Sequence, residues 1–434
     1  MTVEKILVRR PMALFAAALL AAVALPGCGA KTCKRLARDR EAFLSRAAKD
    51  EGTHLEVTVP YAVANALVGP SLEKVEPIAL DVPGLGALSA AFGKLRVRPR
   101  AATLHPAKGG LVGLRLDFDV TAGGSDAFGL WMDAAFAPEV DLKAGAASIG
   151  FSKESLKDVA PHVTDDAAKK LGGVVYGNIP GIARALVARS AVDKAAGAVV
   201  EFLLRQFYAL AKDELLPRVS ELARIRVALP DVPIRDLALA PTDDAGGALR
   251  LSITTSLPVP KGLAPRAADA AALPGDRVSV RATAATFAEL ANWAMAKGLV
   301  PARYNAKGKA DEKGEYLAAL EWVPGKRPMK IHLWQLEGVC KRVDMGAEAA
   351  IDVEDGALRI RATGGVIEGS KASPFTELGV FFYALWKDAV KTTISRPAQL
   401  RFSAGGQELT TRVESATLAG DEVTMTLALA PASK

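Results

Sequence analysis

The feature that most constrains the fold is a set of alternating apolar and polar segments near the start of the chain. Leu55, Val57 and Val59 alternate with polar residues, which is typical of a half-buried strand. Residues 61–68 follow as a short apolar segment that we expect to be helical. Further alternating segments fill residues 95–142 and are separated by pairs of glycines. Together they predict an antiparallel meander with one buried and one solvated face.

A long helix and then more strands are predicted after the meander. Apolar residues recur at helical spacing from residue 182 to residue 216, directly before Pro217, so we predict one long amphipathic helix. Alternating residues return at 225–253. Residues 257–277 are rich in proline and lack a periodic apolar pattern, which predicts a linker between two domains.

The same order of elements occurs again after the linker. A short strand from Val278 leads into a helix over residues 286–297, which ends at Gly298. Four strands are then predicted, at 316–322, 330–336, 347–353 and 357–362. A second long helix follows at 375–393, and the closing strands are predicted at 399–403, 409–413 and 423–429. The fold class is therefore α+β, with two similar domains at residues 53–256 and 278–434.

The first 27 residues have the pattern of an export signal. Residues 1–11 carry three bases and one acid, and the apolar run at 12–25 is shorter than the roughly 20 residues that span a bilayer. The run ends in Leu25-Pro26-Gly27-Cys28, which resembles the lipobox of bacterial lipoproteins. The resemblance implies a signal peptide at 1–27, cleavage before Cys28 and acyl chains on its thiol. The alternative is a plain signal peptide with an accidental Cys28.

Membrane attachment through Cys28 has further consequences. Two or more acyl chains anchor a protein stably. In the sorting rule that the resemblance implies, Gly29 favours the outer membrane, with the protein facing the periplasm or the cell surface. Residues 28–52 are then a tether, which we expect to contain a short helix.

The two other cysteines, Cys33 and Cys340, are candidates for a disulfide, because an exported protein meets an oxidising environment. The alternative is two free thiols. Removal of residues 1–27 lowers the formal charge from +7 to +5 (three bases and one acid are lost). No block of Lys and Arg with interleaved aromatic residues occurs, which argues against a nucleic-acid partner.

The two halves, each with a meander and a long helix, resemble the TULIP superfamily, and more narrowly its two-domain, boomerang-shaped members of the bactericidal/permeability-increasing type. The segment VSVRATAATFAELANWAMAKGLVP, with Asn292 in its helix and Gly298 after it, looks like that family's domain opening. The segment LLPRVSELARIRVALPDVPIRDLALAP looks like its exit from the long helix. The resemblance implies that each domain wraps a twisted antiparallel sheet around one long helix and holds acyl chains in an apolar tunnel.

Large apolar side chains on the two predicted long helices are the candidates for lining such tunnels. They are Phe202, Leu203, Phe207, Phe382, Leu385 and Trp386. The alternative is that these side chains only pack a tight core, as apolar helical stripes usually do.

Signals for chemistry are weak. The four histidines have no metal-ligand spacing with Asp, Glu or Cys, so we expect no metal site and no cofactor beyond the acyl chains at Cys28. Ser71 and Lys74 fit S-x-x-K, but the companion motifs of the serine acyl-enzymes do not accompany them. We therefore predict a non-catalytic lipoprotein that binds or carries lipid at the membrane. The alternatives are an envelope scaffold with packed interiors and no ligand, and an envelope hydrolase.

Overall fold

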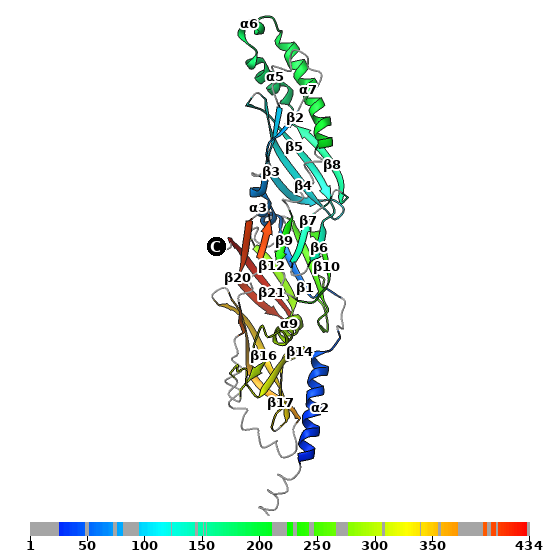
Figure 1. The fold of residues 1–434 in the computed structure, drawn as a ribbon, viewed down its shortest axis with the longest axis vertical. Helices are drawn as coiled ribbons and strands as arrows, with labels where there is room; N and C mark the ends of the chain where they lie inside the picture. Colours follow the sequence, from blue (N-terminus) through cyan, green and yellow to red (C-terminus); the bar gives the residue numbers. More distant parts are fainter. Residues whose placement is uncertain are drawn as a thin grey trace, which may run out of the picture.

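The computed structural model describes residues 26–47, 52–72, 76–80, 95–122, 124–143, 146–150, 152, 154–210, 224–228, 232–242, 247–265, 277–305, 309–338, 340–354, 357–371, 394–396, 401–404 and 407–431. Figure 1 shows an elongated molecule in which three β-sheets follow one another along the long axis, with few helices. All described strand pairs are antiparallel. The predicted mixture of helices with mainly antiparallel sheets is confirmed.

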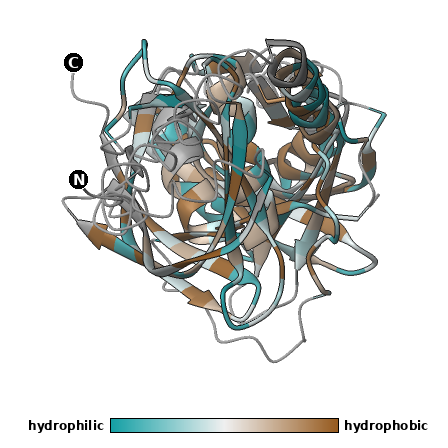
Figure 2. Ribbon diagram, turned by 90° about the horizontal axis from the view of Figure 1, so that it is seen from below, coloured by the Kyte–Doolittle hydropathy of each residue, from teal (hydrophilic) through white to brown (hydrophobic). Residues whose placement is uncertain are grey.

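The sheet at one end of the molecule is the predicted N-terminal meander. Its strand order is β2 (Ile78–Leu80), β3 (Leu95–Ala107), β4 (Leu111–Ala122), β5 (Ser125–Phe136) and β8 (Leu156–Val163). Buried and more exposed residues alternate along β3, β4 and β5. Figure 2, which looks along the long axis from the end opposite this sheet, shows hydrophobic and hydrophilic residues interspersed along strands of the molecule. The period-two pattern of the sequence therefore marks the buried face correctly.

Helices pack on the buried face of this sheet. They are α5 (Ala167–Asn178) and α7 (Arg189–Leu210), and the short helix α6 (Gly181–Arg184) between them is exposed at Ile182. Leu171 and Val175 of α5 and Val192 and Val199 of α7 are buried in the core that these helices share with the sheet. Figure 1 shows α5 and α7 side by side, with α6 at the end of the molecule.

The prediction of one continuous helix from residue 182 to residue 216 is wrong at its start. The helical pattern is interrupted between Arg184 and Arg189, because the chain must reverse there for α7 to pack back along α5. The Arg184 guanidinium stabilises this turn, since its Nη2 donates to the carbonyl oxygens of Gly177, at 2.5 Å, and Ile179, at 3.0 Å. Residues 211–216 lie outside the described residues.

The middle sheet has ten strands taken from both predicted domains. In order they are β10 (Ile234–Thr242), β11 (Ala248–Thr255), β1 (Leu55–Pro60), β12 (Arg277–Thr283), β21 (Glu422–Pro431), β20 (Gln407–Ala419), β19 (Arg401–Ala404), β9 (Ile225–Ala228), β7 (Ala146–Gly150) and β6 (Glu139–Lys143). The first strands of the two predicted domains, β1 and β12, pair directly, with Glu56 opposite Arg281. The two halves thus share one sheet, and the predicted linker at 257–277 joins two of its strands.

The sheet at the other end belongs to the C-terminal half. Its strands are β13 (Arg303–Tyr304), β14 (Tyr316–Trp322), β15 (Met329–Gln335), β16 (Lys341–Glu354), β17 (Ala357–Lys371) and β18 (Ile394–Arg396). Helix α9 (Ala284–Ala296) lies against β14 and follows β12 directly. The predicted second long helix at 375–393 lies outside the described residues.

In both halves, an asparagine side chain joins the first helix to a strand through the same pair of hydrogen bonds. Asn65, in α3 (Tyr61–Leu72), donates its Nδ2 to the carbonyl oxygen of Leu104 and accepts the Leu104 amide on Oδ1. Asn292, in α9, makes the same two bonds with Leu320 of β14, at 2.7 and 2.8 Å. An amide side chain can satisfy one backbone donor and one acceptor together. The device occurs after the first strand of each half and agrees with the internal duplication expected from the sequence.

Helix α2 (Pro26–Leu44) occupies most of the predicted tether. It lies along the C-terminal sheet, and Figure 1 shows its first residues at the end of the molecule opposite α6. A disulfide joins Cys33 of α2 to Cys340, with the two Cα atoms 5.1 Å apart. Leu36 is fully buried against Trp334. The tether is therefore packed on the sheet along much of its length.

Candidate functional site

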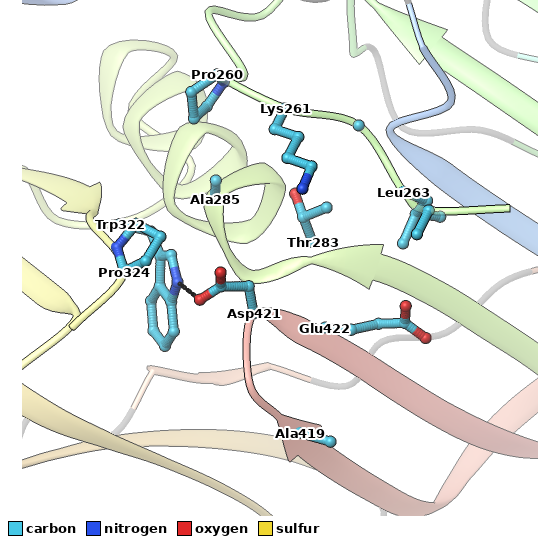
Figure 3. Close-up of a pocket in the computed structure, with 12 residues that line it drawn as sticks. Pro260, Lys261, Leu263, Thr283, Ala285, Trp322, Pro324, Ala419, Asp421 and Glu422 are labelled. Carbon is cyan, nitrogen blue, oxygen red and sulfur yellow. Dashed lines mark hydrogen bonds between the residues drawn. The ribbon is translucent and has the colours of Figure 1, made fainter. Parts of the chain in front are cut away.

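A cleft opens where the C-terminal half meets the middle sheet. It has a volume of about 190 Å³ and is shown in Figure 3. Its walls come from the chain after β11, the start of α9, the end of β14 and the turn between β20 and β21. The lining residues are Pro260, Lys261, Gly262, Leu263, Ala264, Thr283, Ala285, Trp322, Pro324, Ala419, Asp421 and Glu422.

Local hydrogen bonds hold the walls of the cleft in place. Thr283 is the N-cap of α9, and its side chain accepts the amide of Thr286. The Trp322 indole donates Nε1–H to Oδ1 of Asp421 at 2.8 Å, as Figure 3 shows. The Asp421 carbonyl accepts the amide of Ala284 at 2.7 Å. Asp421 therefore ties the β20–β21 turn to both α9 and β14.

A second, apolar pocket lies next to the cleft, between α9 and the sheet strands, and Trp322 lines both. It is lined by Ala284, Phe287, Ala288, Ala291, Leu320, Glu321, Trp322, Met329, Ala349, Ile351 and Val423. Its volume of about 40 Å³ is far below the roughly 300–1,000 Å³ of ordinary ligand pockets. The cleft is large enough for a piece of hydrocarbon, because an apolar cavity of about 150 Å³ can bind benzene. The cleft and the pocket share Trp322, and the cleft also carries the charged residues Lys261, Asp421 and Glu422.

The predicted lining residues lie elsewhere or outside the described part. Leu203 is buried in the N-terminal core on α7, and Phe202 beside it is half-buried. The backbone of Phe207 is part of α7, but its side chain is outside the described residues. Phe382, Leu385 and Trp386 also lie outside the described residues.

Sequence reasoning did not single out the lining residues that the structure brings together. Ala284, Ala288 and Ala291 recur at helical spacing on α9, directly after the N-cap. A stripe of small residues opposite a sheet leaves space, and this signal is visible in the sequence. Trp322 had no such signal, because its role depends on Asp421, which is 99 residues away.

An ionic network fastens the end of α2 to the C-terminal half. Arg46 follows the helix and donates Nη2 to Glu289 of α9 at 2.8 Å and Nη1 to Glu321 of β14 at 2.9 Å. Its guanidinium lies 3.8 Å from the centre of the Phe43 ring. A single arginine therefore joins the tether to both a helix and a strand.

The network continues through a nearly buried histidine. His332 on β15 lies 3.1 Å from Glu321 through Nε2 and 2.6 Å from Asp344 of β16 through Nδ1. Arg342 donates Nε to the same Asp344 oxygen at 2.7 Å. The Phe43 ring of the tether packs edge-on against the His332 ring at 4.9 Å. The tether thus contacts the histidine as well as its carboxylate partner.

The charges of this network shift one another's pKa values. Burial lowers the pKa of His332, but the hydrogen bonds to Asp344 and Glu321 outweigh burial and leave it raised. The bond to His332 lowers the pKa of Glu321. Burial raises the pKa of Asp344, but His332 and Arg342 reverse this effect and leave it lowered. Burial raises the pKa of Glu289 despite its contacts with Arg46 and Asn292. The folded state therefore favours a protonated His332 between ionised carboxylates.

These shifts predict a pH window for stability. The raised pKa of His332 contributes stability that is complete below its unfolded value and is lost as pH rises through the folded value. The lowered pKa values of Glu321 and Asp344 contribute stability above their unfolded values, which is lost as pH falls through the folded ones. We expect the network to stabilise most between about pH 4.5 and 6.5.

The measurement is the melting temperature as a function of pH for the native protein and for His332→Gln. Above pH 6.5 the native protein should lose stability relative to the variant, so that the difference between their melting temperatures becomes smaller. A difference that stays constant from pH 5 to pH 9 would show that His332 does not titrate in this range.

Within the described helices, none is long and apolar enough to cross a membrane. No group of three or more His, Cys, Asp or Glu side chains in the described residues is arranged to hold a metal ion.

Comparison with known proteins found solved structures that are similar over most of their length. P47 of Clostridium botulinum E1 has 10% sequence identity and a TM-score of 0.43, covering 87% of this chain and 98% of P47. P47 from Clostridium botulinum A2 has 9% identity and a TM-score of 0.40, with coverage of 88% and 99%. A lipopolysaccharide binding protein has 11% identity and a TM-score of 0.26, with coverage of 88% and 100%. No protein-family model and no curated protein sequence matches the chain.

Proposed function

We propose that this protein is a membrane-anchored, non-catalytic lipoprotein that binds acyl chains of a lipid in the cleft and pocket beside α9. The observation that carries the proposal is the cleft, which lies next to an apolar pocket and shares Trp322 with it. Each methylene group that leaves water for such a space contributes about 0.8 kcal/mol. A polar head group would stay at the mouth, near Lys261 and Glu422.

Binding of a longer acyl chain requires the pocket to widen. Helix α9 lines it with Phe287 and with three alanines, Ala284, Ala288 and Ala291, and the alanines offer little bulk to displace. A small outward shift of α9 is the simplest way to admit more hydrocarbon. The helix is held to β14 by the two hydrogen bonds of Asn292. The cleft is the site that is open without such a shift.

The TULIP-like architecture is part of the same proposal. Its supports are the duplicated order of elements, the matching asparagine devices at Asn65 and Asn292, and the antiparallel sheets with helices on one face. The anchor is the acylated Cys28 expected from Leu25-Pro26-Gly27-Cys28, and the proposed location is the outer membrane.

The test is binding of the fluorescent fatty acid cis-parinaric acid to the native protein and to Ala419→Trp. Ala419 lines the cleft from an exposed position, so a tryptophan there obstructs the cleft without entering the core. Loss of burial for two methylene groups costs about 1.6 kcal/mol, so the variant should bind roughly tenfold more weakly.

The matched control is Ala296→Trp, at an exposed position of α9 that does not line either space. It should bind like the native protein. Failure of the native protein to bind the fatty acid, together with recovery of only guest-free protein in native mass spectrometry, would contradict the proposal.

A scaffold without a ligand is the second candidate, and one observation favours it. The interior under α5 and α7 is closely packed, with Leu171, Val175, Val192 and Ala196 fully buried. Gly172 of α5 lies so close to Asp193 of α7 that a Cβ atom would collide with it. If fatty acid and phospholipid both fail to bind, this candidate takes precedence over lipid binding.

A further inference from the structure

We propose that the disulfide and the ionic network fix α2 rigidly to the C-terminal sheet. Helix α2 then acts as a mount, which holds the end of the molecule formed by β16 and β17 against the membrane that carries the acyl anchor. This inference rests on the proposed acylation of Cys28. The mount fixes how the elongated body stands on the membrane, which a flexible tether would leave free.

The first step is the short distance between the anchor and the disulfide. Cys28 and Cys33 both belong to α2. Five residues of helix rise about 7.5 Å along the axis. The acylated residue therefore cannot move far from Cys340, to which Cys33 is bonded.

The second step is that α2 is held at separated points. Cys33 is bonded near the start of the helix, Leu36 is fully buried, and Phe43 packs against Trp334 near its end. Beyond the helix, Arg46 pairs with Glu289 and Glu321. Two points some 13 residues apart, roughly 20 Å along a helix, define a direction as well as a position. The helix cannot pivot about the disulfide while Arg46 stays paired.

The third step is where α2 begins. Figure 1 shows its first residues at the end of the long axis where β16 and β17 lie, and α6 at the opposite end. A membrane that holds Cys28 therefore faces the C-terminal sheet. Helix α6 points away from it. The two most exposed large apolar side chains of the described residues, Ile182 at 89% and Leu186 at 85%, lie at that far end.

A free tether would behave differently. Gly52 is 24 positions after Cys28, and this length of chain would reach up to about 80 Å if extended. As a flexible chain they would spread over roughly 25 Å. Either value lets the body take many orientations relative to the membrane. The contacts that hold α2 to the C-terminal sheet restrict it to one orientation.

The experiment is neutron reflectometry of the full-length acylated protein on a supported phospholipid bilayer. The native protein should give a layer whose inner edge against the bilayer is sharp. The Cys33→Ser/Cys340→Ser/Arg46→Ala variant should blur that edge by roughly 25 Å, the spread of the released tether. Ser45→Ala is the matched control, because Ser45 bonds only the Glu41 carbonyl among the contacts described for it, and its layer should match that of the native protein.

Two further measurements keep the outcomes distinct. Mild reductant added to the native layer tests the disulfide without a change in sequence, and circular dichroism checks that the variant is folded. Equal inner edges for a retained native protein and a folded variant would overturn the mount and leave the anchor intact. A Cys28→Ala variant, which lacks the acylated thiol, serves as the reference for an unanchored protein. A native protein that washes off the bilayer as readily as this variant would overturn the anchor, and the mount with it.

Discussion

Replacement of Cys33 and Cys340 together by serine should lower the free energy of unfolding by about 2 to 5 kcal/mol. The bridge joins residues 307 positions apart, so it closes a very long loop in the unfolded chain. In the chain-entropy description, a longer loop gives a larger loss of unfolded-state entropy and a larger stabilisation. The bridge also keeps Leu36 and Phe43 in contact with the C-terminal sheet, and part of the loss should come from their exposure.

The measurement is denaturation in urea, followed by tryptophan fluorescence, for the native protein and the double variant. Ser45→Ala serves as the control on the same helix and should leave the midpoint within the error of the measurement. Equal midpoints for the native protein and the double variant would show that α2 is released before the body unfolds and that the bridge stabilises only the tether.

Arg281→Ala should destabilise the protein by about 3 to 5 kcal/mol, because it removes one partner of a buried ionic cluster. Arg281 lies on β12 in the middle of the ten-stranded sheet, and its side chain is 9% exposed. It donates to Glu56 of β1 at 3.0 Å and to Glu422 of β21 at 2.7 Å. Its pKa is raised, chiefly by the bond to Glu422. Without it, Glu56 keeps a more distant contact with Arg250, at 3.7 Å.

This substitution also tests whether the two halves unfold together. Because β1 and β12 belong to one sheet, we expect the native protein to unfold in one transition when it is followed by circular dichroism and by fluorescence. Arg412→Ala is the matched control, since Arg412 is exposed on β20 of the same sheet. An effect of Arg281→Ala no larger than that of Arg412→Ala would contradict the role assigned to the cluster.

The sequence predicted the strands better than the helices. Residues 316–322 were expected as a strand and are β14, and the alternation over 95–136 became β3, β4 and β5 with one face buried. The end of the predicted meander, at Val140 and Leu142, is instead β6 of the middle sheet, because it pairs with β7. The predicted helix was wrong at its start because helical spacing continues from Ile182 of α6 through the turn at Leu186, where both side chains are exposed. Spacing reports which residues could share a face, but the position of the turn depends on where α5 and α7 pack together.

The candidate site was harder to predict than the fold. The predicted lining residue Leu203 belongs to a packed core, whereas the cleft is built around Trp322 and Asp421. The helix of α9 and its end at Gly298 were expected, and Gly298 has the positive φ of 70° that such a helix end requires. The space beside α9 was not expected, because a cavity depends on how completely side chains from distant segments fill the volume between them.

By itself, the sequence determined the local properties of this protein: which residues alternate in strands, where α9 begins and ends, and which segment before Cys28 has the pattern of an export signal. These properties depend on neighbours within a few residues. Only the tertiary structure decided that β1 pairs with β12, that Cys33 meets Cys340, and that α2 packs on the C-terminal sheet instead of leading away from it. Periodicity specifies that a face is buried but not the partner that buries it, because the partner is chosen by packing summed over residues far apart in the chain.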